Sequence, residues 1–521
     1  MDTKDLILEH TALARSSGYG QGAGSYARPS MKTFHASSNS PKSDIDPYNG
    51  TMRQRGRTLV MTSPVASACV DTIVTNVVGT GLHLKSRIDT RTLGMTSAEA
   101  EAWQDKAELE FKLFADKAQT CDSTGLNNFY ALSRLVEKSC TESGDCFVIR
   151  DWAEPSVLSP YSLRLRVIEA DRCATPYEYG GTSYATEGFN PKTKNKIYDG
   201  VEVDSKGKVV AYWFRSTYPY ETRAQACDWS RIEVMGEYGI PNVLHIMESS
   251  RPEQYRGVTV FAPIMEETRE LNKYMKAELG AAVLESYFTV IVKSNSDVRA
   301  NPFNPQYQND EDERPTEFKI GQNTWAHLKP GEDVVFANPT RPSSGLPEFE
   351  KVVNKHTAAA LGLPSEVVLK EHNKSYSASR ASRLDAESTF TLKQSKLIDT
   401  FINPVYEMLI TEAVARGRIS APGFFTDPIR HNAYLGAEWV GPTMGQLDPV
   451  KEVNALGAAV DRGWTTNAAA AQRMFGTEFD SNAEELEREN KRMQWKEEAS
   501  TDVAHEWAID SKDNQEGEDT E

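Results

Sequence analysis

The chain has 521 residues, of which 39% are hydrophobic and 26% charged, and its formal net charge at pH 7 is -17. This length exceeds what a single hydrophobic core organises, so several modules are expected. No uncharged apolar run approaches the roughly 18 residues that a membrane span needs, and the acidic balance disfavours a conventional tight DNA binder, which neutralises phosphates with clustered Lys and Arg.

The start, Met1–Leu6, lacks the basic and apolar regions of a signal peptide, so the protein is expected to stay in the cytosol where it is made. The six cysteines are therefore expected to be reduced. Cys140 and Cys146 lie close in sequence, but no CxxC pair or paired histidines accompany them, and we interpret them as small buried apolar residues.

The first fifty residues are predicted to form a flexible arm. Gly18–Gly24 is rich in glycine, and Ala36–Pro47 is rich in Ser, Asn and Pro. The glycine string is not a nucleotide loop, because it lacks the preceding apolar strand and the following helix. Ordered structure is predicted to begin near Arg53.

Helices are predicted next, followed by strands. The helix boundaries are Ser63-Pro64 to Gly79, a capping box at Thr96 and Glu99, and about Asn127 to Cys140. From Cys146 to Ile246 the apolar period changes to two, and a hairpin is predicted at Asp204–Gly207. The first half of the chain is thus predicted to be α+β.

Pro263 begins a predicted helix with a modest apolar face that suits packing between subunits. The chain becomes β-like at Phe288–Val292 and then passes through the polar stretch Asn295–Pro315. A second helix is predicted from about Pro347 to Leu361, where glycine and proline follow.

Ser365–Ser375 is polar and shows no regular period, and a long helix with apolar residues from Leu384 to Val405 follows it. Asn403-Pro404 should kink this helix, because proline cannot donate the backbone hydrogen bond. A helical region is expected from about Pro449 to Trp495, and the acidic tail Asp510–Glu521 is predicted to be disordered.

Several short motifs together resemble the lambda-type portal family of tailed bacteriophages, in the order and spacing found there. They extend over roughly residues 50 to 470. The motifs are Asn76-Val-Val-Gly-Thr-Gly-Leu82, Ile168-Glu-Ala-Asp171, Gly200-Val-Glu-Val-Asp204, Arg251-Pro-Glu-Gln-Tyr-Arg-Gly257, Leu328-Lys-Pro-Gly-Glu332 and Tyr376-Ser-Ala-Ser-Arg-Ala381. The last departs from the family's usual paired serines before Ala-Arg, so neither Ser377 nor Ser379 is assigned a role.

The resemblance implies a ring-forming α+β portal fold. It has an α/β wing, a helical stem, a β-containing clip, a long kinked helix with a tunnel loop, and a helical crown. The implied parts are a flexible arm (1–50), the wing (51–260), a first stem helix (261–293), the clip (294–345), a second stem helix (346–362), the tunnel loop (363–381), the long helix with the rest of the wing (382–445), the crown (446–500) and an acidic disordered tail (501–521).

The function implied by the resemblance is a dodecameric channel for double-stranded DNA at the unique capsid vertex, used for genome packaging and later ejection. The implied partners are the terminase large subunit, neck and tail proteins, and the scaffold and major capsid proteins, without a membrane. The implied location is the virion, and the host cytoplasm during assembly. An acidic wall is compatible with such a conduit, since it leaves few strong phosphate contacts to break as DNA slides.

Two groups of residues are candidate sites under this interpretation. In a closed ring, each loop residue facing the axis is repeated around it, so Lys370, His372, Asn373 and Lys374 would form a collar near DNA; the alternative is a solvated surface loop. Arg251, Gln254 and Arg256 are candidate contacts between subunits, or else they form a local turn with charged flanks.

The alternative function is a phage-encoded enzyme that acts on nucleic acid or capsid protein, with groups such as Asp171 and His245 converging in space. The sequence contains no Gly-x-x-x-x-Gly-Lys-Ser/Thr loop, no His-Glu-x-x-His and no Gly-x-Ser-x-Gly. We therefore predict no enzymatic activity, and assign no catalytic, cofactor or metal-binding residues.

Overall fold

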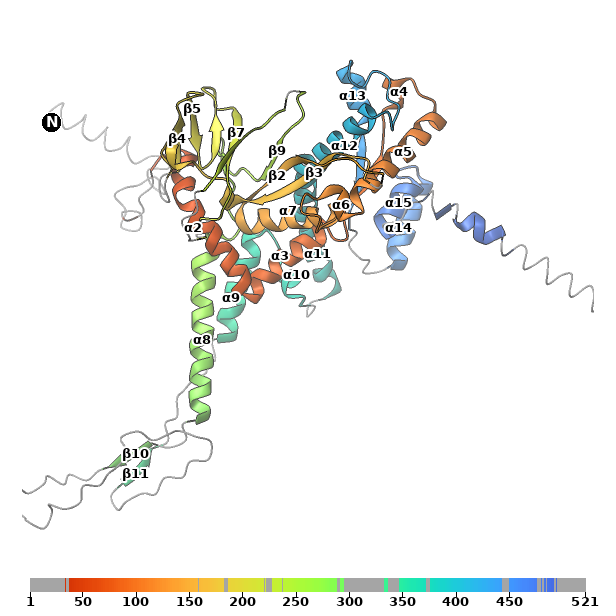
Figure 1. Cartoon of the computed structure of the whole chain (residues 1–521). Coiled ribbons are helices and arrows are strands. Elements are labelled where there is room, and N and C mark those ends of the chain that lie inside the picture. Colours follow the sequence, from red (N-terminus) through yellow and green to blue (C-terminus); the bar gives the residue numbers. More distant parts are fainter. Residues whose placement is uncertain are drawn as a thin grey trace, which may run out of the picture.

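The computed structural model describes residues 37–157, 159–181, 186–219, 227–236, 238–287, 291–294, 332–335, 346–371, 375–442 and 449–475, with single residues and short stretches elsewhere. These residues form both helices and sheets (Figure 1), which confirms the mixed class predicted from the sequence. Within this described part, no single helix is long and apolar enough to cross a membrane; helices α2 and α3, which meet at 99°, pass that test only as a bent pair.

Helix α2 (Pro41–Thr62) begins well before Arg53, so the predicted flexible arm is wrong for residues 41–50. The Ser40 side chain caps the helix by accepting a hydrogen bond from the Ser43 backbone N–H. The buried face of α2 includes Asp46, Asn49 and Arg53, and this polar character is why apolar periodicity did not reveal the helix.

The remaining helices of the first half lie where the sequence predicted the main ones. Thr96 and Glu99 form both hydrogen bonds of the capping box, and Gly79, with φ +55°, follows the first predicted helix. The helices are α3 (Pro64–Val77), α4 (Thr90–Leu93), α5 (Ser97–Ala115), α6 (Ala118–Cys121) and α7 (Phe129–Ser143).

An antiparallel sheet of order β3-β2-β9 lies at the centre of the body. Its strands are β2 (Asp145–Trp152), β3 (Leu163–Glu169) and β9 (Val243–Met247). Alternate residues of β2 enter different cores: Cys146 and Val148 pack with the helices, whereas Phe147 packs with the second sheet. This strand therefore joins the two hydrophobic cores.

The second sheet is antiparallel and follows chain order. Its strands are β4 (Glu187–Asn190), β5 (Asn195–Tyr198), β6 (Val201–Val203), β7 (Val209–Arg215) and β8 (Trp229–Glu233). The predicted hairpin is confirmed, because Asp204 accepts hydrogen bonds from the Lys206 and Lys208 backbone N–H groups and Gly207 adopts φ +85°.

Helix α8 (Met265–Tyr287) projects away from the body, as Figure 1 shows, and α9 (Leu346–Ala360) runs beside its upper part. Tyr274 and Phe349 meet edge to face between them, with ring centroids 5.9 Å apart. Strands β10 (Ile291–Ser294) and β11 (Glu332–Val335) pair beyond the end of α8. The two predicted helices are confirmed, and most of the stretch between them lies outside the described residues.

The last part of the chain returns to the body. Strand β12 (Ala437–Val440) pairs antiparallel with β1 (His83–Ser86), some 350 residues earlier. The helices are α10 (Ser365–Leu369), α11 (Tyr376–Leu397), α12 (Asn403–Ala415), α13 (Pro428–Tyr434), α14 (Pro449–Asp461) and α15 (Asn467–Phe475).

Two predictions for this part need correction or refinement. The start of the aperiodic segment is helical, since α10 covers Ser365–Leu369 and is too short to show a period. A π-helical turn, Ile398–Ile402, precedes Pro404, and the Asn403 N–H reaches back to the Ile398 carbonyl. The helix therefore accommodates Pro404, where a kink was predicted, through a π-helical turn that joins α11 to α12.

Candidate functional site

The segment Arg251–Gly257 packs against helix α2. Arg251 Nη1 lies 2.6 Å from a carboxylate oxygen of Asp44, and its Nη2 donates to the Asn39 carbonyl at 2.9 Å. Further along the helix, Asn49 Nδ2 donates to the Gly257 carbonyl at 2.9 Å. The segment therefore contacts α2 at two positions five residues apart, more than one helical turn, and also contacts the chain just before the helix.

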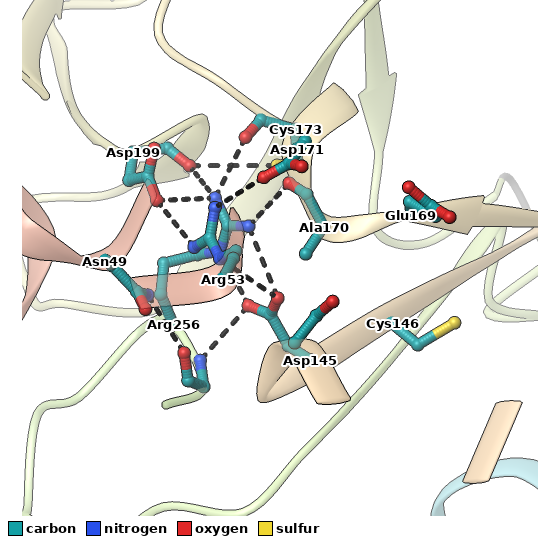
Figure 2. A network of polar contacts seen from close by, with 12 residues as sticks. Asn49, Arg53, Asp145, Cys146, Glu169, Ala170, Asp171, Cys173, Asp199 and Arg256 are labelled. Carbon is teal, nitrogen blue, oxygen red and sulfur yellow. Dashed lines mark hydrogen bonds and ion pairs between the residues drawn. The ribbon is translucent and has the colours of Figure 1, made fainter. Parts of the chain in front are cut away.

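Arg256 is at the centre of a buried charge network, which we define as Arg53, Arg57, Arg256, Asp145, Asp171 and Asp199. Its guanidinium is fully buried; Nε contacts Asp145 Oδ2 at 2.7 Å and Nη1 contacts Asp199 Oδ2 at 2.8 Å (Figure 2). The same group donates to the carbonyls of Cys173 at 2.9 Å and Ala170 at 2.8 Å. One side chain thus links strand β2 with the ends of β3 and β5.

Helix α2 supplies the other two arginines of the charge network. Arg53 Nη2 donates to Asp199 Oδ2 at 2.8 Å, and Arg57 pairs with Asp171. Three arginines therefore face three aspartates. Removing these groups from water costs several kcal/mol per ion, so each depends on the pairing that the others provide.

The charge network sets the protonation of its members. Burial alone would raise the pKa of Asp145, but the Arg256 and Arg53 guanidiniums outweigh it and hold this pKa well below its usual range. Burial lowers the pKa of His245, although its Nε2 lies 3.3 Å from Asp145 Oδ2. His245 also stacks on Phe147 with ring centroids 4.2 Å apart, so its ring takes part in the packing of this region.

Close backbone contact explains the glycine that ends the motif. A Cβ atom on Gly257 would lie 2.0 Å from the Gly144 carbonyl oxygen, far inside van der Waals contact. The Gly257 N–H donates to Asp145 Oδ2 at 3.1 Å. Glycine therefore lets the motif lie directly against the start of β2.

A second polar cluster surrounds Glu202 in the five-stranded sheet. Its buried carboxylate accepts hydrogen bonds from Arg231 Nε at 2.8 Å, Thr193 Oγ1 at 2.6 Å, and Asn195 Nδ2 and Trp213 Nε1, each at 3.0 Å. Burial alone would raise the pKa of Glu202, but these donors lower it to about 2. The carboxylate therefore stays charged and connects the strands around it.

The structure places the predicted intersubunit residues in different environments. Gln254 is buried and bonds within its own turn, accepting from the Ser250 and Arg251 backbone N–H groups and donating to the Arg256 carbonyl. Gln254 fits the alternative of a local turn, whereas Arg256 is buried in the charge network and contacts segments of its own chain that are far away in sequence. For Arg251, which is partly exposed, an intersubunit contact stays a prediction.

Of the predicted tunnel-loop residues, only Lys370 lies within the described structure. It ends α10 with a left-handed backbone, φ 54°, and it is exposed. His372, Asn373 and Lys374 lie outside the described residues. Proximity of this loop to DNA therefore stays a prediction.

Helix α8 carries an apolar stripe that the described part of its own chain leaves exposed. Met275, Leu279 and Val283 are four residues apart and so lie on one face. Leu279 is 66% exposed, and Met275 and Val283 are 41% and 45% exposed. Apolar side chains aligned on a projecting helix are typical of a surface that another protein covers.

Comparison with known proteins gives consistent matches. The family model described as phage portal protein, lambda family, matches residues 27–394. The chain is 21% identical to portal protein B of Escherichia phage lambda, covering 88% of this chain and 86% of that protein, and 21% identical to the portal protein of Escherichia phage N15, covering 88% and 87%. A solved chain in the neck of a native GTA particle, computed with C12 symmetry, is 13% identical with a TM-score of 0.39, over 80% of this chain and 92% of that one.

Proposed function

Because the chain belongs to the lambda family of phage portal proteins, we propose that it forms a closed dodecameric ring at one vertex of a viral head, through which double-stranded DNA enters and later leaves. The family is structural, so the work of the ring is geometric and electrostatic. The groups named for the alternative of an enzyme take part in the packing of the fold: Asp171 pairs with Arg57, and His245 stacks on Phe147 beside Asp145.

The observation that best supports ring formation is the apolar stripe of α8. This helix has 23 residues, which corresponds to about 35 Å at 1.5 Å per residue. A head-to-tail contact that closes on itself brings the same two surfaces together at every interface of a ring. Neighbouring copies of α8 and α9 would then cover Met275, Leu279 and Val283.

The remaining roles follow from the same proposal. Residues 294–345, beyond α8, would receive the terminase large subunit and later the neck and tail proteins. Residues 51–260 would face the scaffold and major capsid proteins. Lys370 and its neighbours would place a basic collar near DNA within an otherwise acidic protein, whose net charge is -17. ATP hydrolysis belongs to the terminase in this arrangement.

Electron microscopy combined with native mass measurement tests the ring and its interface together. We expect the wild-type chain to form rings with a central channel, and Leu279→Glu to shift the population to species smaller than a ring. Leu126→Glu is the matched control, because Leu126 is 80% exposed and lies away from α8.

Two outcomes contradict this proposal in different ways. A wild-type chain that remains monomeric or dimeric with scaffold and capsid proteins present would overturn the ring. Rings formed equally well by Leu279→Glu would keep the ring and reject the α8 stripe as its interface.

A further inference from the structure

Asp46 is a buried carboxyl group without the pairing that its neighbours have. It lies on the inner face of α2 and is only 4% exposed. Its Oδ2 atom has no hydrogen-bond partner among the described residues, and no ion pair involves Asp46 within that part of the chain. A buried carboxylate in this position is costly unless it holds a proton.

The two arginines nearest Asp46 are already paired with other carboxylates. Arg53 and Arg256 face it, but both are already engaged by Asp145 and Asp199. The carboxylates of Asp199 and of Glu187 on β4 also face Asp46, and both disfavour a further negative charge. An ionised Asp46 would add a fourth aspartate to a network in which three arginines already balance three aspartates.

The two other charged side chains along this half of α2, Lys42 and Asp44, are engaged elsewhere. Lys42 Nζ lies over the rings of Tyr198 and Tyr255, 4.3 and 4.9 Å from their centroids. Asp44 pairs with Arg251 at the surface. Burial, reinforced by Asp199, raises the pKa of Asp46 to about 7, which agrees with this geometry.

Helix α2 connects parts of the molecule that are far apart in sequence. Its first half contacts Tyr198, the last residue of β5, through Lys42 and the Arg251–Gly257 segment through Asn49; just past its midpoint, Arg53 pairs with Asp199 in the turn between β5 and β6. Its second half contacts α7 and α8, and Gly56 lies close to Met265, the first residue of α8. Figure 1 shows α2 running from the five-stranded sheet to the upper end of α8. Whatever loosens the first half of α2 therefore loosens a link between the sheet and the projecting helix.

We propose that Asp46 is a proton-operated latch: while its carboxyl is neutral, the first half of α2 is held against the β5–β6 turn and the Arg251–Gly257 segment, and ionisation loosens it. The trapped proton satisfies a carboxyl group that has no cation of its own. When the first half of α2 moves away, the Asp46 carboxyl reaches water and ionises with its ordinary pKa of 3.8. The latch operates within one subunit and does not depend on ring formation.

Hydrogen exchange read by mass spectrometry, over pH 5 to 9, tests the latch on the full chain. After correction for intrinsic exchange rates, protection of residues 41–50 should fall about tenfold per pH unit up to about pH 7 and then level off, because the open form is ionised throughout this range and the closed form is not. Residues 64–77 of α3 provide the internal reference.

Two variants separate Asp46 from other titrating groups. Asp46→Asn, which cannot ionise, should remove the fall in protection, whereas Asp71→Asn on the exposed face of α3 should keep it. His245 has a lowered pKa and so changes stability in the opposite direction with pH, which cannot produce the expected fall. A flat wild-type profile overturns the proposal even if Asp46→Asn fails to fold, as does an unchanged slope in that variant.

Discussion

Replacing Arg256 by methionine should destabilise the junction between α2 and the two sheets. Methionine preserves much of the apolar stem but removes the guanidinium that contacts Asp145 and Asp199. Both carboxylates would then depend on Arg53 alone. Removing one partner of a buried ion pair costs roughly 3–5 kcal/mol, because the remaining charge is left buried. A domain's stability is only about 5–15 kcal/mol, so this loss is a large fraction of it.

Urea unfolding followed by far-ultraviolet circular dichroism, with hydrogen exchange of residues 41–62, measures the effect. A chain of this size need not unfold in one step, so the first transition that includes α2 is the one to compare. Arg251→Met is the matched control: its ion pair with Asp44 is exposed on both sides and is worth at most about 1 kcal/mol. Equal shifts for the two variants would refute the central role assigned to Arg256.

Three other variants test separate features. Gly257→Ala should destabilise the protein by more than about 1 kcal/mol in thermal or urea unfolding, because the added Cβ overpacks the contact with Gly144 and displaces the backbone. Gly280→Ala is its control: the added Cβ meets no atom within 4 Å, so this variant should gain about 0.5–1 kcal/mol of helix stability. The pKa of Glu202 is lowered from 4.5 to about 2, so its ionised carboxylate stabilises the folded protein by about 3 kcal/mol above pH 4.5, and this stabilisation is lost as the pH falls toward 2. The melting temperature of Glu202→Gln should show little of this acid dependence. Lys370→Ala combined with Lys374→Ala should reduce DNA packaging and retention, and unchanged packaging would exclude this loop as the DNA contact.

The sequence predicted those elements that have a regular apolar period or a recognisable cap. The capping box at Thr96 and Glu99, the hairpin at Asp204–Gly207 and the two helices that became α8 and α9 all lie where local patterns placed them. These elements depend on interactions within a few residues, which local reasoning captures. The pairing of β1 with β12 joins segments about 350 residues apart, and no local pattern specifies such a partner.

The charge network was missed because it reverses the usual rule for a buried helix face. Asp46, Asn49 and Arg53 repeat every three or four residues, so a helical period was present, but in polar side chains. The sequence singles out the segment Arg251–Gly257, but it leaves open whether Arg256 contacts another subunit or belongs to a local turn, and neither alternative predicts its buried ion pairs with Asp145 and Asp199. Its partners, Asp145 and Asp199, come from strand ends that only the folded chain brings together.

Polar contacts fix the register of α2 in a way that an apolar face would not. Asn49, Arg53 and Arg57 are four residues apart, so a slip of one helical turn, about 5.4 Å, places one of these residues where another was. A slip in one direction puts Asn49 in the place of Arg53 and leaves the aspartates short of a cation. A slip in the other direction puts Val60 in the place of Gly56, where even a Cβ atom would lie 2.7 Å from the Glu142 carbonyl oxygen. Because neither alternative keeps both the charges and the close contact, we infer that the charge network serves to position α2 in a single register between the sheet and α8.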